Sequence, residues 1–273
     1  MKKCTAIIFY SALFFLFSCT GGKKENVQQQ STVENDKCPV TTDTIRIHEE
    51  YTFAYDKENA PRLTINITLP YFNLGNKEAN AKMDSTLAEG LFFYDIPTLP
   101  KACDYCIAEL KEMFNELRDE YNNFSEGETP PGMMGCYCDI TGKAETGYKG
   151  YVSYIMTREE YWGGAHPNTV NAITCFDPAT GSEITLDDIF KEGYEEELLT
   201  MLINQLIKNE GVSTIEELHD AGYYFDTDMF ISQNFILGND GVTFLYNRYE
   251  IAPYAMGDIL ITLDYKTLKK IMK

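Results

Sequence analysis

The cysteines are the residues of this 273-residue chain whose spacing most suggests chemistry, and there are eight of them. Cys103 and Cys106 stand three positions apart near the start of a predicted helix, where a helix N-terminus lowers a thiol pKa as in disulfide oxidoreductases. Together with Cys136 and Cys138 they would also supply four sulfurs for a tetrahedral zinc site. Redox chemistry, a zinc site and structural disulfides are therefore three interpretations of the same residues.

The N-terminus helps to choose among them because it predicts the compartment. Two lysines precede an apolar run over residues 6–17, which has the length of a signal-peptide core and is too short to span a bilayer. A small residue then precedes Cys19, and this arrangement resembles a bacterial lipobox. We expect a lipoprotein signal peptide over residues 1–18, a lipid anchor on Cys19 and a flexible tether over residues 19–42. The expected location is the cell envelope, with the outer membrane as the anchoring membrane.

An exported chain holds its cysteines in an oxidising compartment, where disulfides are the expected state. Six cysteines remain after the signal and the anchor: Cys38, Cys103, Cys106, Cys136, Cys138 and Cys175. Their spacing does not choose among the possible pairings. We predict structural disulfides, no metal and no cofactor, and keep zinc binding and redox catalysis as alternatives.

Two irregular loops carry aromatic residues that would suit a binding surface. The candidates in the first loop are Trp162, Gly163, Gly164 and His166, and those in the second are Tyr249, Pro253 and Tyr254. Tyrosine and tryptophan on a stiff loop either pack on a sheet or present amphipathic anchors to a partner. We predict that these seven residues form a contact surface.

Catalytic motifs are absent from the sequence: there is no G-x-S-x-G, H-E-x-x-H or P-loop. Asp187 and Asp188 are adjacent, so they would not face each other on a helix, and acids are the preferred residues at a helix N-terminus. His166 has no other histidine at ligand spacing, which favours a structural role within its loop. We predict no catalytic residue, with an envelope hydrolase or redox enzyme as the alternative and a purely structural envelope protein as a third.

The elements that must position these loops fall into separate clusters of strands and helices. Strands are expected over residues 44–55, 62–69, 137–143, 148–158, 169–176, 235–237, 242–246 and 259–263, and helices over 76–93, 102–121, 195–208 and 214–218. This order favours an α+β fold of two small mixed subdomains, with antiparallel sheets and helices packed on them. We place the domains at residues 43–158 and 159–273.

The charge of the chain narrows the class of partner. There are 42 acidic and 23 basic residues, a net charge of −19, and loss of the signal would deepen it by two. Nucleic acids and anionic lipid surfaces would be repelled by such a chain, whereas cationic partners would be attracted.

Three motifs, in residues 161–168, 181–190 and 246–257, resemble the extracellular domain of RsiV-type anti-sigma factors. The same domain accompanies some exported polysaccharide deacetylases. The preceding region, residues 43–158, resembles the partner domain that usually comes before it. The resemblance implies an α+β extracellular module without catalytic residues of its own, which in RsiV proteins binds lysozyme.

The resemblance does not extend to the sigma-binding and membrane-spanning segments of RsiV or to a deacetylase domain, and the chain carries a lipobox instead. Signalling to a sigma factor is therefore not implied. We expect a non-catalytic, lipid-anchored binding module whose partner is a basic protein such as lysozyme or a cell-wall glycan, and not a nucleic acid.

Overall fold

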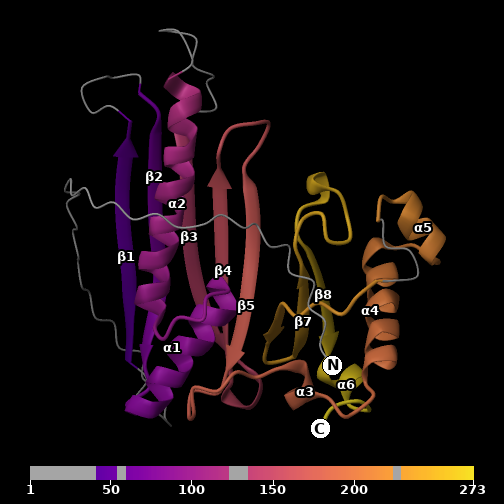
Figure 1. Ribbon diagram of the computed structural model, residues 1–273. Coiled ribbons are helices and arrows are strands. Elements are labelled where there is room, and N and C mark those ends of the chain that lie inside the picture. Colours follow the sequence, from indigo (N-terminus) through magenta and orange to yellow (C-terminus); the bar gives the residue numbers. More distant parts are fainter. Residues whose placement is uncertain (1–40, 54–59, 123–134, 224–228) are drawn as a thin grey trace.

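The computed structural model describes residues 41–53, 60–122, 135–223 and 229–273 (Figure 1). The predicted signal peptide, Cys19, Cys38 and most of the predicted tether lie outside the described residues. The last two tether positions, Thr41 and Thr42, already belong to the first strand. No helix among the described residues is long and apolar enough to cross a membrane.

Five strands form the larger sheet in the order of the chain. They are β1 (Thr41–Thr52), β2 (Arg62–Asn73), β3 (Gly135–Thr146), β4 (Val152–Tyr161) and β5 (Asn168–Phe176). All neighbours are antiparallel except β2 and β3, which are parallel. The expectation of purely antiparallel sheets is wrong at this pair, because two helices connect β2 to β3 and return the chain to the same end of the sheet.

Helices α1 (Lys77–Phe92) and α2 (Leu99–Asn122) make this connection and cover one face of the sheet (Figure 1). The side chain of Asn76 begins α1 by accepting hydrogen bonds from two backbone N–H groups of its first turn. The alternating apolar residues of β2, from Leu63 to Leu69, are fully buried against the helices. The intervening residues Thr64, Asn66 and Thr68 point to the opposite face, which neither helix covers.

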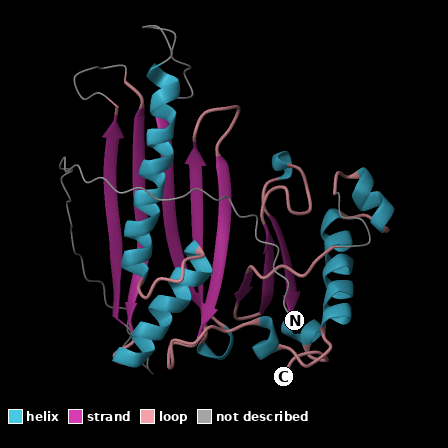
Figure 2. Cartoon of the chain, in the orientation of Figure 1, coloured by secondary structure: helices cyan, strands magenta, loops and turns pink. Residues whose placement is uncertain are grey.

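The second part of the chain forms a smaller antiparallel sheet with its own helices (Figure 2). Its strands are β6 (Phe235–Leu237), β7 (Gly241–Tyr246) and β8 (Ile259–Asp264), and its helices are α3 (Leu186–Ile189), α4 (Glu195–Glu210), α5 (Ile215–Asp220) and α6 (Tyr265–Leu268). Short 3-10 helices lie at Tyr148–Gly150 and Tyr254–Met256. The predicted α+β class is confirmed. The expected strand over residues 148–158 begins only at Val152, after the first 3-10 helix, and residues 54 and 55 of the first expected strand lie outside the described residues.

The described residues form two cores, and strands β4 and β5 contribute side chains to both. Ile155 of β4 and Ile173 of β5 belong to the core of the second sheet, while their neighbours Tyr154 and Ala172 belong to the core under the helices. The expected domain limit after residue 158 falls inside β4, and β5 continues the same sheet. Strands β4 and β5 therefore belong to both parts, because their two faces are buried by different elements.

Candidate functional site

The two loops that the sequence marked lie side by side. The His166 ring stacks on the Tyr254 ring with 3.8 Å between centroids and 21° between planes, and the Tyr249 ring lies 5.7 Å from that of Tyr254. The hydroxyl of Tyr254 donates to the carbonyl oxygen of Pro167, 3.1 Å away. The loop after β4 and the loop after β7 thus form one surface.

Arg248 is the basic residue at the centre of this surface. Its guanidinium lies 4.6 Å from the centroid of the Tyr254 ring, and its Nη1 donates to Tyr254 Oη at 2.9 Å and to Thr169 Oγ1 at 3.1 Å. Its Nε lies 3.8 Å from Asp258 Oδ1, too far for a hydrogen bond. We call His166, Arg248, Tyr249 and Tyr254 the loop cluster.

Tyr249 is held outward by an unusual backbone conformation. Its φ is 69°, in the left-handed region that only glycine and a few polar residues adopt readily. The backbone N–H of Tyr249 donates to the Ala252 carbonyl oxygen, which fixes the turn, and the side chain is 56% exposed. Strained residues of this kind cluster at functional sites, which makes Tyr249 a candidate contact residue.

A second pair of rings continues the surface onto the sheet. Tyr137 of β3 and Tyr161 of β4 are register partners whose rings stack at 6.1 Å, and Tyr161 Oη donates to the Gly164 carbonyl oxygen. Tyr137 Oη donates to Glu159 Oε1 at 2.9 Å, and this bond, with some burial, raises the pKa of Tyr137 to about 12. We call Tyr137 and Tyr161 the tyrosine pair.

Two buried asparagines fix the second loop to the edge of the large sheet. Asn247 Oδ1 accepts from the backbone N–H and the side chain of Asn171, at 2.7 and 3.1 Å, and Asn247 Nδ2 donates to the Asn171 carbonyl oxygen. Asn171 Nδ2 also donates to Asp258 Oδ2, at the far end of the loop. Burial raises the pKa of Glu250, whose carboxylate accepts from the backbone N–H of Asn247. Both ends of the loop are therefore tied to β5.

Trp162 is separated from this surface by the alternation of the strand. Its ring is half-buried against the core under the helices, and its Nε1 donates to Glu160 Oε2 at 3.3 Å. The same carboxylate accepts two hydrogen bonds from Arg158. Trp162 thus anchors the base of the first loop on the helix-covered side, while Gly163 and Gly164 turn the chain with φ of 97° and 108°.

Pro253 lies at the start of the 3-10 helix that carries Tyr254 and is exposed. Its ring fixes φ near −62° and so sets the direction in which this short helix begins.

The five described cysteines are buried thiols, and no disulfide joins any of them. They are Cys103, Cys106, Cys136, Cys138 and Cys175. The predicted disulfides are not present among these five residues in this structure, and Cys38 lies outside the described residues. No group of three or more His, Cys, Asp or Glu side chains in the described part of the chain is arranged to hold a metal.

The same burial opposes redox chemistry at the Cys103–Cys106 pair. It raises the pKa of Cys103 to about 12 and that of Cys106 to about 11, whereas a helix N-terminus was expected to lower them. Both thiols lie within α2 and face the core, so desolvation outweighs the helix dipole. Protonated thiols are poor nucleophiles.

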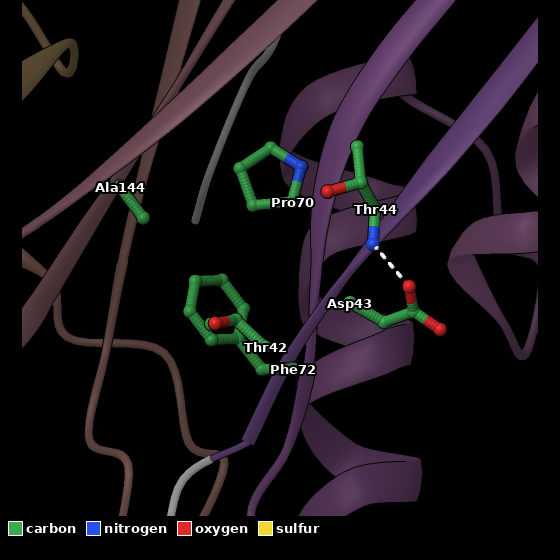
Figure 3. A pocket seen from close by; sticks show the side chains of 6 residues that line it. All are labelled: Thr42, Asp43, Thr44, Pro70, Phe72 and Ala144. Atoms are coloured by element: carbon green, nitrogen blue, oxygen red, sulfur yellow. Dashed lines mark hydrogen bonds between the residues drawn. The ribbon is translucent and has the colours of Figure 1, made fainter. Parts of the chain in front are cut away.

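A small pocket of about 220 Å³ lies at the opposite end of the large sheet (Figure 3). It is lined by Thr42, Asp43, Thr44, Pro70, Phe72 and Ala144. Asp43 is the single titratable residue of this lining, and its Oδ1 accepts from the backbone N–H of Thr44 at 2.7 Å. The pocket offers no acid–base pair, and it lies far from the loop cluster along the strands.

Asp187 and Asp188 lie in the first turn of α3, as expected of acids at a helix N-terminus. Asp188 Oδ2 accepts from the backbone N–H of Thr185 at 2.8 Å, which closes a capping box at the start of α3. By contrast, the sequence did not mark Tyr137, Glu159 or Arg248. The alternation of polar residues in β3 and β4 was the available signal for the first two, since it places both on the open face.

Comparison with known proteins finds a family model that matches part of the chain. Residues 187–266 match the family model "Protein of unknown function (DUF3298)", a range that runs from α3 into α6 and includes the second loop. A crystal structure of a member of this family from Bacteroides fragilis has 27% sequence identity and a TM-score of 0.74, covering 86% of this chain and 94% of that one. A DUF3298 family protein from Pseudomonas aeruginosa, at 16% identity and a TM-score of 0.57, shares the fold over 87% of this chain and 95% of its own.

A curated relative carries a name that states an activity. The peptidoglycan-N-acetylmuramic acid deacetylase PdaC of Bacillus subtilis is 27% identical over 124 residues, which are 45% of this chain and 26% of the deacetylase. The chain therefore spans about a quarter of that relative's length. This match agrees with the predicted relation to proteins that include polysaccharide deacetylases; the RsiV part of the resemblance remains a prediction.

Proposed function

We propose that this protein is a non-catalytic module of the cell envelope that binds cell-wall glycan through the loop cluster and the tyrosine pair. The observation that carries the proposal is the stack of His166 on Tyr254, which joins two loops 88 positions apart into one aromatic surface. His166 and Tyr249 are exposed, and hydrogen bonds hold both loops in place, so the surface can bind a ligand without first being ordered.

The chemistry of this surface suits a sugar chain. Aromatic rings pack against the apolar C–H faces of sugar rings, and the surrounding polar groups can exchange hydrogen bonds with hydroxyl groups. Glu159 supplies acceptors and Arg248 supplies donors beside the rings, with distances of 2.9 and 3.1 Å to their present partners Tyr137 and Thr169. Aromatic side chains with a few placed hydrogen-bonding groups are the side-chain types that commonly orient a bound small molecule.

The relation to a peptidoglycan deacetylase supports a cell-wall ligand over other glycans. We extend the proposal to location: a lipid on Cys19 holds the module at a membrane, most simply the outer membrane, and a polar tether lets it reach the wall. Non-catalytic binding agrees with the raised thiol pKa values at Cys103 and Cys106.

A basic protein such as lysozyme is the second candidate partner. The net charge of −19 favours it, because an acidic surface accelerates encounter with a basic partner and strengthens the complex at low salt. The RsiV resemblance points the same way. The net charge does not locate a contact, whereas the aromatic surface does, and for that reason we place glycan first.

Co-sedimentation with purified peptidoglycan sacculi tests the proposal. The residue 20–273 protein should pellet with sacculi, and the Tyr249→Ala/Tyr254→Ala variant should lose at least about tenfold in affinity. Tyr105→Ala is the matched control, since Tyr105 is an exposed aromatic residue on α2, over the other face of the sheet. Equal binding by all three proteins would contradict the proposed surface, and release of soluble fragments from the sacculi would contradict a non-catalytic role.

The same proteins can be used to distinguish the two candidate partners, glycan and lysozyme. Titration with hen-type lysozyme at low and moderate salt should give weaker binding than titration with sacculi fragments. Tight lysozyme binding that the Tyr249→Ala/Tyr254→Ala variant abolishes, without glycan binding, would replace the glycan by the basic protein.

A further inference from the structure

A row of hydrogen-bonding side chains crosses all five strands on the face that α1 and α2 leave open. Each member is the register partner of the next, on neighbouring strands from β1 to β5. The members of this polar row are His48, Asn66, Asp139, Glu159 and Thr169. They share one level of the sheet and form a line of polar groups across the strands. The first four are exposed or half-buried, whereas Thr169 is buried beneath Arg248 of the loop cluster.

Hydrogen bonds connect the row to the loop cluster. Asn66 Oδ1 lies 2.7 Å from Nδ1 of His48, and Asn66 Nδ2 donates to Asp139 Oδ1 at 2.7 Å. At the other end, Thr169 Oγ1 donates to Glu159 Oε2 at 3.5 Å and accepts from Arg248 Nη1 at 3.1 Å. The polar row is therefore continuous with the aromatic surface of the two loops.

The length of this row fits a polymer better than a single sugar. Neighbouring strands lie about 4.8 Å apart, so five strands span about 20 Å from the first member to the last. The loop cluster lies beyond the β5 end and adds to this length. A sugar chain laid across the strands would meet rings at one end and polar groups along the rest.

The negative charge of the polar row favours sugar chains that carry positive charge. Asp139 and Glu159 are direct register partners, and like charges opposite each other on adjacent strands destabilise a sheet. Asn66, Tyr137 and Thr169 donate hydrogen bonds to these carboxylates, but among the described residues no lysine or arginine forms a salt bridge with either. A ligand with positive charge would relieve this repulsion, whereas a neutral one would not.

We infer that the polar row binds an extended amino-sugar chain whose free ammonium groups lie against Asp139 and Glu159. This inference rests on the proposed function and names the class of glycan: a de-N-acetylated polymer rather than its fully N-acetylated counterpart. The tyrosine pair and the loop cluster hold the sugar rings, and the row distinguishes their substituents.

Calorimetric titration with chitosan oligosaccharides, from disaccharide to hexasaccharide, tests the inference against N-acetylated chains of equal length. The de-N-acetylated hexasaccharide should bind at least about tenfold more tightly than the acetylated one, and the difference should shrink at high salt. Its affinity should also exceed that of the disaccharide. Asp139→Asn and Glu159→Gln should each remove most of the preference for ammonium groups.

Two further variants locate the contact on the row. Asn66→Ala should weaken the hexasaccharide and leave the disaccharide unchanged. Glu116→Gln, which removes one exposed carboxylate from α2 over the other face, should change neither and so controls for net charge. Equal affinity for acetylated and de-N-acetylated chains, or no dependence on length, overturns the inference while sacculi binding preserves the proposed function; absence of binding to sacculi overturns both.

Discussion

Among the described residues, two aromatic side chains stand on left-handed backbone, and comparing them distinguishes a role in binding from a role in stability. Tyr249 has φ of 69° and Phe93 has φ of 60°, and both side chains are exposed. Phe93 ends α1 at the position where glycine is usual, over the helix-covered face of the sheet. Tyr249 lies in the loop cluster. Neither strained residue is explained by packing, but only one belongs to the proposed contact.

Substituting glycine at Tyr249 should abolish binding and at Phe93 should not, whereas both substitutions should affect stability similarly. Tyr249→Gly and Phe93→Gly each relieve the left-handed strain, and the free energy of unfolding should stay constant or rise by up to about 1 kcal/mol. Urea denaturation checks this. Tyr249→Gly should lose sacculi binding and Phe93→Gly should keep it. A large loss of stability in Tyr249→Gly, or a loss of binding in Phe93→Gly, would contradict the assignment.

The thiols give a second prediction at the scale of single residues. Alkylation without a reductant should label none of the five described cysteines rapidly in the folded protein, because they are buried and their pKa values are raised, to about 12 for Cys138 and Cys175. After unfolding, all five should be labelled and seen by mass spectrometry. Peptides joined through two of these cysteines would show that the oxidised protein differs from this structure.

Among the elements, the junction between β5 and the second loop positions the site through buried hydrogen bonds. Asn247→Ala would leave the backbone N–H and carbonyl of Asn171 without their partners in a buried position, which should lower the free energy of unfolding by about 1–3 kcal/mol. Binding to sacculi should fall as well, at temperatures where the variant is folded. Thr243→Ala, in an exposed pair with Thr262 on β7 and β8, is the control and should change both little. A stable Asn247→Ala variant with full binding would show that the loop holds itself.

The elements were also the part of the structure most accessible to prediction. Apolar alternation in β2 and the helical spacing of α1, α2 and α4 identify these elements because each buries one face against a core. Pairing was less accessible: nothing local in β2 or β3 distinguishes a parallel neighbour from an antiparallel one. The site residues were likewise only partly predictable. His166 and Tyr254 could be identified from the composition of their loops. The orientation of Trp162 depends on the alternation of β4, and the role of Arg248 depends on two distant loops coming together.

For the whole molecule, burial of many titratable groups predicts a loss of stability at alkaline pH. Burial raises the pKa of Cys103, Cys138 and Cys175 from about 9 to about 12, so the unfolded chain releases these protons first. The contribution of these thiols to the free energy of unfolding should therefore be fully present below about pH 9 and should be lost as the pH rises toward 12. Urea unfolding over this range measures the decline, which should be smaller in Cys175→Ala.

Repulsion within an acidic chain would also grow with pH as lysines lose their charge, and salt distinguishes the two causes. The decline caused by burial should persist in high salt. Its disappearance there would attribute the effect to surface charge instead.

The most direct test of the binding surface is hydroxyl-radical footprinting of the protein bound to sacculi fragments. We predict protection of Tyr161, His166, Tyr249 and Tyr254. The helix-side residues Phe93, Tyr105 and Met113 should be equally reactive with and without ligand. Protection of the helix-side residues, with the loop cluster unchanged, would contradict this prediction.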